Sequence, residues 1–162
     1  MEQLKNADIE RLLGSGKVIT EGSKKGMTLR SGSLRNDLKL ETTDGKDRFS
    51  AFIRVSESFV EDFSIGIDYI TDEGKHICLM RCNGKHGEHR NHRPGSQPFY
   101  DFHIHLATEE AIDQGESPEQ FAEQTNEYAT WQDALRYFFE RANVKNAVEY
   151  FPEISQKNLF ET

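Results

Sequence analysis

The sequence predicts an α+β fold: a single domain built on a mostly antiparallel sheet of four to six strands. Three observations support this prediction. An amphipathic segment opens the chain, the central part places apolar residues at every second position, and helical periodicity returns near the C-terminus. A chain of 162 residues is long enough for one domain with a substantial core. We therefore expect one domain over residues 1–150, with the helices packed on one face of the sheet, and an extended tail over residues 151–162.

The N-terminal helix is predicted between residues 2 and 13. Gly14 follows it and is a typical residue for a helix end. This segment is charged and lacks the apolar core of a secretory signal, and no run of 18 apolar residues occurs in the chain. These features predict a cytoplasmic protein. The apolar positions that recur at helical spacing are Leu4, Ala7, Ile9, Leu12 and Leu13.

The strands are predicted from the alternation of apolar and polar residues in the central part of the chain. Asp44-Gly45 lies between the first two strands and favours a tight hairpin turn, because this pair accepts positive φ angles. Most of these strands should bury one face only, which is typical of an antiparallel sheet. The expected strands are 38–40, 49–55, 63–69, 76–82 and 102–106.

Two helices are expected in the C-terminal third. Ser117-Pro118 has the residue types of a helix start, and Thr130 can cap a second, stronger helix. The second helix has a wide aromatic stripe and should cover the sheet. The stripe consists of Trp131, Ala134, Leu135, Phe138, Phe139 and Ala142.

The charge of the chain limits the partners that it can bind. With 20 basic and 28 acidic residues the formal net charge is −8, which excludes a nonspecific nucleic-acid binder that uses its whole surface. Residues 85–93 reverse this sign, because Lys85, Arg90 and Arg93 face only Glu88. This local excess of positive charge predicts an anion site.

Histidines are concentrated in one part of the sequence. Residues 84–106 contain five of the six, namely His86, His89, His92, His103 and His105. In an extended strand over 102–106, the apolar residues at 102, 104 and 106 point to one face. His103 and His105 then share the opposite face, so the sequence predicts that these two imidazoles project together.

One hypothesis for this cluster is cleavage of a phosphodiester bond in RNA or a nucleotide, as in enzymes of the toxin or phage-defence type. The reaction needs a base for the 2′-hydroxyl, an acid for the leaving oxygen and a cation for the phosphoryl charge. His89 and either His103 or His105 would serve as acid and base, with no cofactor. The remaining roles would be phosphate binding by Lys85, Arg90 and Arg93, with support from Asn91 and Tyr100.

Two other interpretations remain open. His89, His103 and His105 could ligate a divalent transition metal such as zinc, with an open position for water, in a metal-dependent hydrolase. Alternatively, the histidines lie on a solvated hairpin loop, and the chain is a non-catalytic phage or regulatory protein whose acidic surface binds a partner protein. The sequence does not decide among the three.

The order of motifs resembles a family of small bacterial and phage proteins whose function is unknown. Asn83-Gly84, His89-Arg90-Asn91 and His103-Ile104-His105, followed by an aromatic amphipathic helix, are similar to that family's H-R-N loop and H-[LI]-H strand. The resemblance covers about residues 38–143 and implies a site at His89, His103 and His105, without implying its chemistry. The chain departs from the pattern at His92, where the family has Pro, and in a longer segment over 107–129.

The C-terminal residues resemble a second kind of motif. Gln156, Leu159 and Phe160 match the Q-x-x-L-F peptides that dock on bacterial sliding clamps, although Lys157 stands where Leu is usual. This resemblance implies a clamp as partner. The alternative is that Leu159 and Phe160 pack on the chain's own domain.

Overall fold

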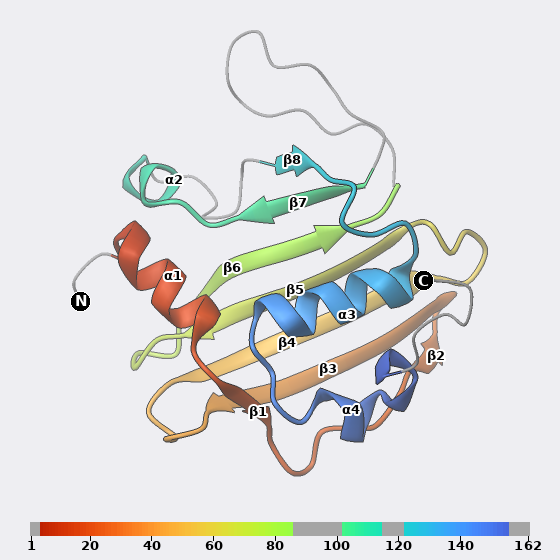
Figure 1. Cartoon of the computed structure of the whole chain (residues 1–162), viewed down its shortest axis with the longest axis horizontal. Coiled ribbons are helices and arrows are strands. Elements are labelled where there is room, and N and C mark those ends of the chain that lie inside the picture. The colour runs from red at the N-terminus through yellow and green to blue at the C-terminus, as the bar shows by residue number, and fades with distance from the viewer. Residues whose placement is uncertain (1–3, 86–101, 115–121, 156–162) are drawn as a thin grey trace, which may run out of the picture.

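The computed structural model describes residues 4–85, 102–114 and 122–155. Within these ranges eight strands form one sheet, in which every paired strand runs antiparallel (Figure 1). The order is β1-β3-β4-β5-β6-β7-β8, and β2 also pairs with β3. The strands are β1 (Lys17–Ile19), β2 (Thr28–Arg30), β3 (Ser33–Thr42), β4 (Arg48–Ser56), β5 (Phe63–Ile70), β6 (His76–Asn83), β7 (His103–Leu106) and β8 (Ala122–Gln124).

The α+β class predicted from the sequence is confirmed. The sheet has more strands than the expected four to six because three-residue strands extend its edges. Hairpins join β3 to β4 and β5 to β6. At these two turns Gly45 and Gly74 adopt φ angles of 74° and 84°, a conformation that glycine tolerates best, and the first of them is the predicted Asp-Gly turn.

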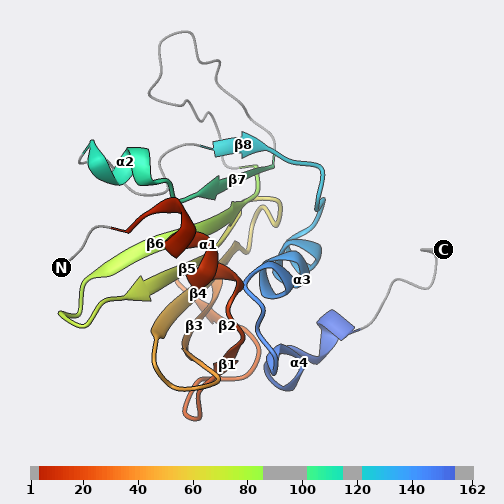
Figure 2. The same cartoon turned by 60° about the vertical axis from the view of Figure 1, so that its left-hand side comes forward.

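The helices α1, α3 and α4 lie over one face of this sheet (Figures 1 and 2). Thr130 caps α3 as predicted, since its side chain accepts a hydrogen bond from the backbone nitrogen of Asp133 at 3.1 Å. In the described part of the chain, no helix is long and apolar enough to cross a membrane. The helices are α1 (Asn6–Gly14), α2 (Glu109–Asp113), α3 (Trp131–Arg141), α4 (Ala147–Tyr150) and the 3₁₀ helix η1 (Pro152–Ser155).

The structure corrects the extended tail expected from residue 151 onward for its described part, residues 151–155. Phe151 is completely buried and Ile154 is 9% exposed, and both belong to the core. The Phe151 ring packs 5.6 Å from that of Phe139, and the carbonyl of Ile154 accepts a hydrogen bond from Arg136 Nε. Two apolar residues three positions apart favour a short helical turn against α3. The predicted clamp motif at 156–160 and the helix start at 117–118 lie outside the described residues.

A buried lysine joins the ends of α1 and α3. Lys17 is fully buried, and its Nζ donates to the carbonyls of Leu13, Ser15 and Ala142 at 2.8, 2.9 and 2.8 Å. Two of these carbonyls lie at the end of α1, and that of Ala142 follows the last residue of α3. Helix C-termini attract cations because the helix dipole is negative there. One side-chain amino group therefore joins two helix ends through three hydrogen bonds.

Replacing Lys17 by methionine is expected to lower the free energy of unfolding by about 1–3 kcal/mol, because buried carbonyls lose their donor while the apolar stem is kept. Urea denaturation would measure the change. Lys75→Met, in the exposed β5–β6 turn, is the matched control and should change the stability little. Equal stabilities for Lys17→Met and wild type would contradict this role for Lys17.

The difference in stability between wild type and Lys17→Met should depend on pH. Burial lowers the pKa of Lys17 from its ordinary 10.5 to about 8. Between pH 8 and 10.5 the Lys17 amino group is protonated in the unfolded chain and largely deprotonated in the folded chain. The free energy of unfolding therefore increases as the pH rises through this range. The stability difference between wild type and Lys17→Met should therefore widen from pH 8 towards 10.

Candidate functional site

The face of the sheet opposite α1, α3 and α4 carries two rows of side chains in register. Residues that are directly opposite on paired strands project to the same face, so the register defines each row. The first row, from β3 to β7, is Arg35, Arg54, Ser64, Asn83 and His103. The second row is Asp37, Phe52, Gly66, Arg81 and His105. We call these ten residues the polar face.

His103 and His105 share this face, as the alternation predicted. Ile104 lies between them and pairs with Cys82, a core residue on the other face. The two imidazole centroids are 5.1 Å apart, with the rings inclined at 64°. Each histidine is only 1% exposed, whereas Leu106 on the apolar side is 39% exposed. The helix α3 packs against β5, two strands away, which leaves the apolar side of β7 less covered.

A chain of polar contacts leads to His103. Ser64 Oγ donates to Asn83 Oδ1 at 2.6 Å, and Asn83 Nδ2 lies 3.4 Å from His103 Nε2. Because the amide oxygen of Asn83 accepts from Ser64, its amide nitrogen is the donor towards the imidazole. Nε2 is then an acceptor, and the proton of a neutral His103 ring belongs on Nδ1.

Tyr128 fixes the backbone at the same point. Its hydroxyl donates to the carbonyls of Asn83 and His103, at 2.9 and 2.8 Å. Burial raises the pKa of this phenol well above its ordinary value, so it stays protonated as a donor. Tyr128 therefore links β6 and β7 at the two residues that contact each other on the polar face. No sequence motif marked this tyrosine.

The middle of the polar face contains a hollow of about 460 Å³. Phe52 lies on its floor, over Gly66, where a Cβ would collide with the aromatic ring. A glycine at this position therefore allows an aromatic ring to lie against the sheet. This central hollow is lined by Arg35, Asp37, Phe52, Ile53, Arg54, Ser64, Arg81 and Asn83.

The electrostatics of the central hollow favour an anion. Among the described residues of its lining, there are three arginines and one carboxylate, Asp37. Arg35 and Arg54 are directly opposite one another on β3 and β4, and like charges in that arrangement are unfavourable. Arg54 has Asp62 at 3.3 Å, whereas no ion pair among the described residues involves Arg35. A bound anion such as phosphate would offset this repulsion.

Most loop residues predicted for the site lie outside the described residues. These are His89, Arg90, Asn91, Arg93 and Tyr100, together with His86 and His92. Lys85 is described, but it does not line the central hollow. Its Nζ lies 3.7 Å from Glu61 Oε2 and 5.4 Å from the centroid of the Phe102 ring.

The described residues include two of the three histidines that were predicted to bind a metal, His103 and His105. Within residues 4–85, 102–114 and 122–155, no group of three histidine, cysteine or carboxylate side chains is placed to hold a metal ion. His103 and His105 would supply two ligands, and the third predicted ligand, His89, is not described. Zinc binding by these three histidines therefore stays a prediction.

Sequence reasoning missed the arginines of the polar face. Arg35, Arg54 and Arg81 come from three strands and lie far apart in the sequence. Each alternates with buried residues, so the period of two could have assigned each to the polar side of its own strand. Only the register of the hairpins places them in adjacent rows.

Comparison with protein-family models, with curated proteins and with solved structures finds no match for this chain. The resemblance to the H-R-N and H-[LI]-H family therefore stays a prediction. The site has to be interpreted from its own residues, which are a histidine pair beside an arginine-lined hollow.

Proposed function

We propose that the chain is a cytoplasmic phosphodiester-cleaving enzyme that acts on RNA, with the polar face as its active site. One observation supports this most strongly. The histidine pair continues two rows in which every other member except Gly66 lines a cationic hollow, because Asn83 is opposite His103 and Arg81 is opposite His105. The groups that we propose as acid, base and phosphate-binding residues would thus act on one face.

In the proposed reaction, the 2′-hydroxyl of RNA attacks the adjacent phosphorus and the bond to the 5′-oxygen breaks. One imidazole takes the hydroxyl proton, and an imidazolium gives a proton to the leaving 5′-oxygen. His103 and His105 are the described candidates, and His89 stays a predicted third. The arginines would stabilise the charge that develops on the phosphoryl oxygens. The products would be a 2′,3′-cyclic phosphate and a 5′-hydroxyl.

The substrate must reach two rings that are almost fully buried. The central hollow offers an approach, since Asn83 and Arg81 in its lining are the cross-strand neighbours of the histidines. The Ser64–Asn83 contacts would hold His103 in one tautomer, which is the role of the orienting partner beside a catalytic histidine. Substrate binding and proton transfer would then occur on adjacent strands.

The test is incubation of the purified protein with a single-stranded RNA and with the all-2′-deoxy strand of the same sequence. We expect cleavage of the RNA to 2′,3′-cyclic phosphate ends and no cleavage of the DNA, which lacks the attacking hydroxyl. The absence of RNA cleavage would overturn the proposal and favour the non-catalytic, partner-binding interpretation. Cleavage that is lost with a chelator and restored by zinc would identify the metal-dependent form.

A further inference from the structure

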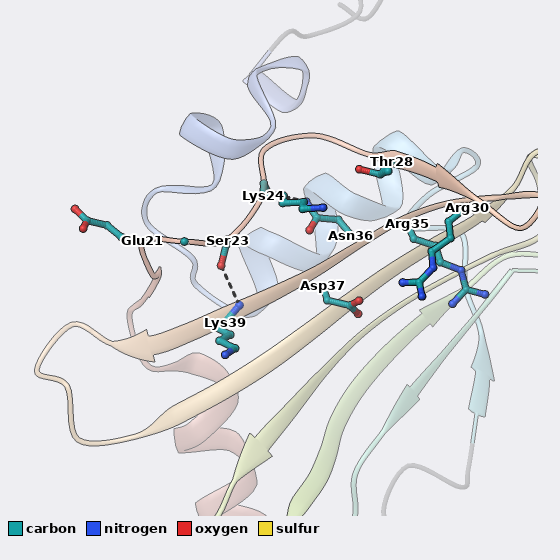
Figure 3. A pocket seen from close by; sticks show the side chains of 10 residues that line it. Glu21, Ser23, Lys24, Thr28, Arg30, Arg35, Asn36, Asp37 and Lys39 are labelled. Atoms are coloured by element: carbon teal, nitrogen blue, oxygen red, sulfur yellow. Dashed lines mark hydrogen bonds between the residues drawn. The ribbon is translucent and has the colours of Figure 1, made fainter.

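A second hollow lies beside the first, towards β2. This outer hollow has a volume of about 390 Å³ and lies between β3 and the segment 21–28 (Figure 3). Arg35 and Asp37 line both hollows, so the two join on the polar face. The outer hollow is lined by Glu21, Gly22, Ser23, Lys24, Thr28, Arg30, Arg35, Asn36, Asp37 and Lys39.

The wall of the outer hollow is held by specific hydrogen bonds. Asn36 is 7% exposed, and its Nδ2 donates to the carbonyls of Lys24 and Gly26 at 2.8 and 2.6 Å. Ser23 Oγ accepts from the backbone nitrogen of Lys39 at 3.2 Å. These hydrogen bonds fix the segment 21–28 against β3. The shape of the outer hollow is therefore set by the fold.

Positive charge runs along both hollows. Their linings include two carboxylates, Glu21 and Asp37, in a protein whose net charge is −8. Arg30 is a diagonal neighbour of Arg35, because Thr28 pairs with Arg35 and Arg30 lies two residues further along β2 (Figure 3). The cations of the two linings are Lys24, Arg30, Arg35, Lys39, Arg54 and Arg81.

The line of cations is longer than a single phosphate requires. Arg30 stands on β2 and His103 on β7, five strand spacings apart, which is about 24 Å at roughly 4.8 Å per strand. The aromatic ring of Phe52 lies between these ends, on the floor of the central hollow. Cations that follow a backbone, combined with an aromatic ring for a base, are the elements of single-strand recognition.

We propose that the two hollows form one groove that binds single-stranded RNA across the strands, with several consecutive phosphates on the arginines and one base stacked on Phe52. This inference rests on the proposed function and narrows its substrate from RNA in general to single-stranded RNA of several nucleotides. One end of the RNA strand would lie near β2. The bond to be cleaved would lie at the other end of the groove, beside the histidine pair. A duplex is excluded as the preferred ligand, because paired bases cannot stack on Phe52.

The test is equilibrium binding of 2′-O-methyl oligonucleotides, which cannot be cleaved, measured by fluorescence anisotropy over a range of salt concentrations. We expect a dodecanucleotide to bind at least tenfold more tightly than a dinucleotide, because it neutralises more cations. Each lost phosphate contact should reduce the salt dependence, the slope of log K against log salt, by about 0.7. Lys24→Ala and Arg30→Ala should each show this reduction.

Matched controls separate the groove from general charge effects. Lys75→Ala in the β5–β6 turn and Arg141→Ala at the end of α3 remove exposed cations outside the groove, and should leave the slope unchanged. Phe52→Leu should weaken binding about tenfold through lost stacking, whereas Phe59→Leu, at an exposed phenylalanine, should not. Equal effects of groove and control variants would overturn the groove, as would equally tight binding of a duplex.

The two proposals fail in distinguishable ways. If the protein cleaves RNA but binds short and long oligonucleotides equally tightly, the catalytic proposal is supported and the groove proposal is overturned. Length-dependent binding that responds to Lys24→Ala and Arg30→Ala, without any cleavage of RNA, would support the groove and overturn the catalytic proposal.

Discussion

Replacing His103 by glutamine should lower the rate of RNA cleavage by about 10²–10⁴-fold, the range typical for loss of a general acid or base. The glutamine amide can take the position of Nε2 and keep a contact with Asn83, but it cannot transfer a proton at neutral pH. The same loss is expected for His105→Gln. The double variant should be little worse than either single variant, because acid and base act in one step.

His76 provides a matched control for these substitutions. It stands at the start of β6, is half exposed, and has Nδ1 at 3.3 Å from Asp68 Oδ2, away from the central hollow. His76→Gln should leave the cleavage rate unchanged. Thermal unfolding and binding of the 2′-O-methyl strand would show that the His103 and His105 variants remain folded. A folded His103→Gln protein that cleaves RNA at the wild-type rate would remove His103 from the mechanism.

Replacing Gly84 by alanine should lower the free energy of unfolding by about 3 kcal/mol, the upper end of the usual cost of overpacking. A Cβ at this position would collide with the backbone oxygen of Glu61 and with the ring of Phe63. The two backbones are in contact here, since the nitrogen of Gly84 donates to the carbonyl of Phe63 at 2.9 Å and that of Lys85 donates to Glu61 at 2.7 Å. A backbone atom held by hydrogen bonds cannot move aside as a flexible side chain can.

Gly14→Ala is the control for this substitution. Gly14 ends α1, and a Cβ there would have no atom within 4 Å, so we expect a change within about 1 kcal/mol, in the stabilising direction. Urea denaturation of wild type, Gly84→Ala and Gly14→Ala would compare their free energies of unfolding. Similar stabilities for Gly84→Ala and Gly14→Ala would show that β5 and β6 can separate at this end without cost.

The parts of the fold that could be predicted are those with a repeating pattern. Alternation located the long strands, and the stripe from Trp131 to Ala142 with its cap at Thr130 located α3. The strands β1, β2 and β8 have three residues each, which is too short for a period to be recognised. Phe151 and Ile154 show why the tail was misplaced: two apolar residues indicate a packed turn only when the position of α3 is known.

The candidate site was predictable within one strand but not across strands. The common face of His103 and His105 follows from alternation alone. Their cross-strand neighbours depend on the pairing of β7 with β6 on one side and β8 on the other, which the sequence of β7 does not contain. The approach of Arg81 to His105 likewise depends on register, which is set by turns and by the buried faces of neighbouring strands.

The short border strands also affect how the molecule meets other chains. A long exposed strand at the border of a sheet is a template on which another chain can pair. Here β1 and β2 each pair with one end of β3. Between them, the carbonyl of Lys39 accepts a hydrogen bond from the nitrogen of Thr20 at 2.8 Å, and the nitrogen of Lys39 donates to Ser23 Oγ. The opposite border is the three-residue β8, with exposed Glu123 and Gln124. Within the described residues, the sheet therefore offers little open backbone for self-association.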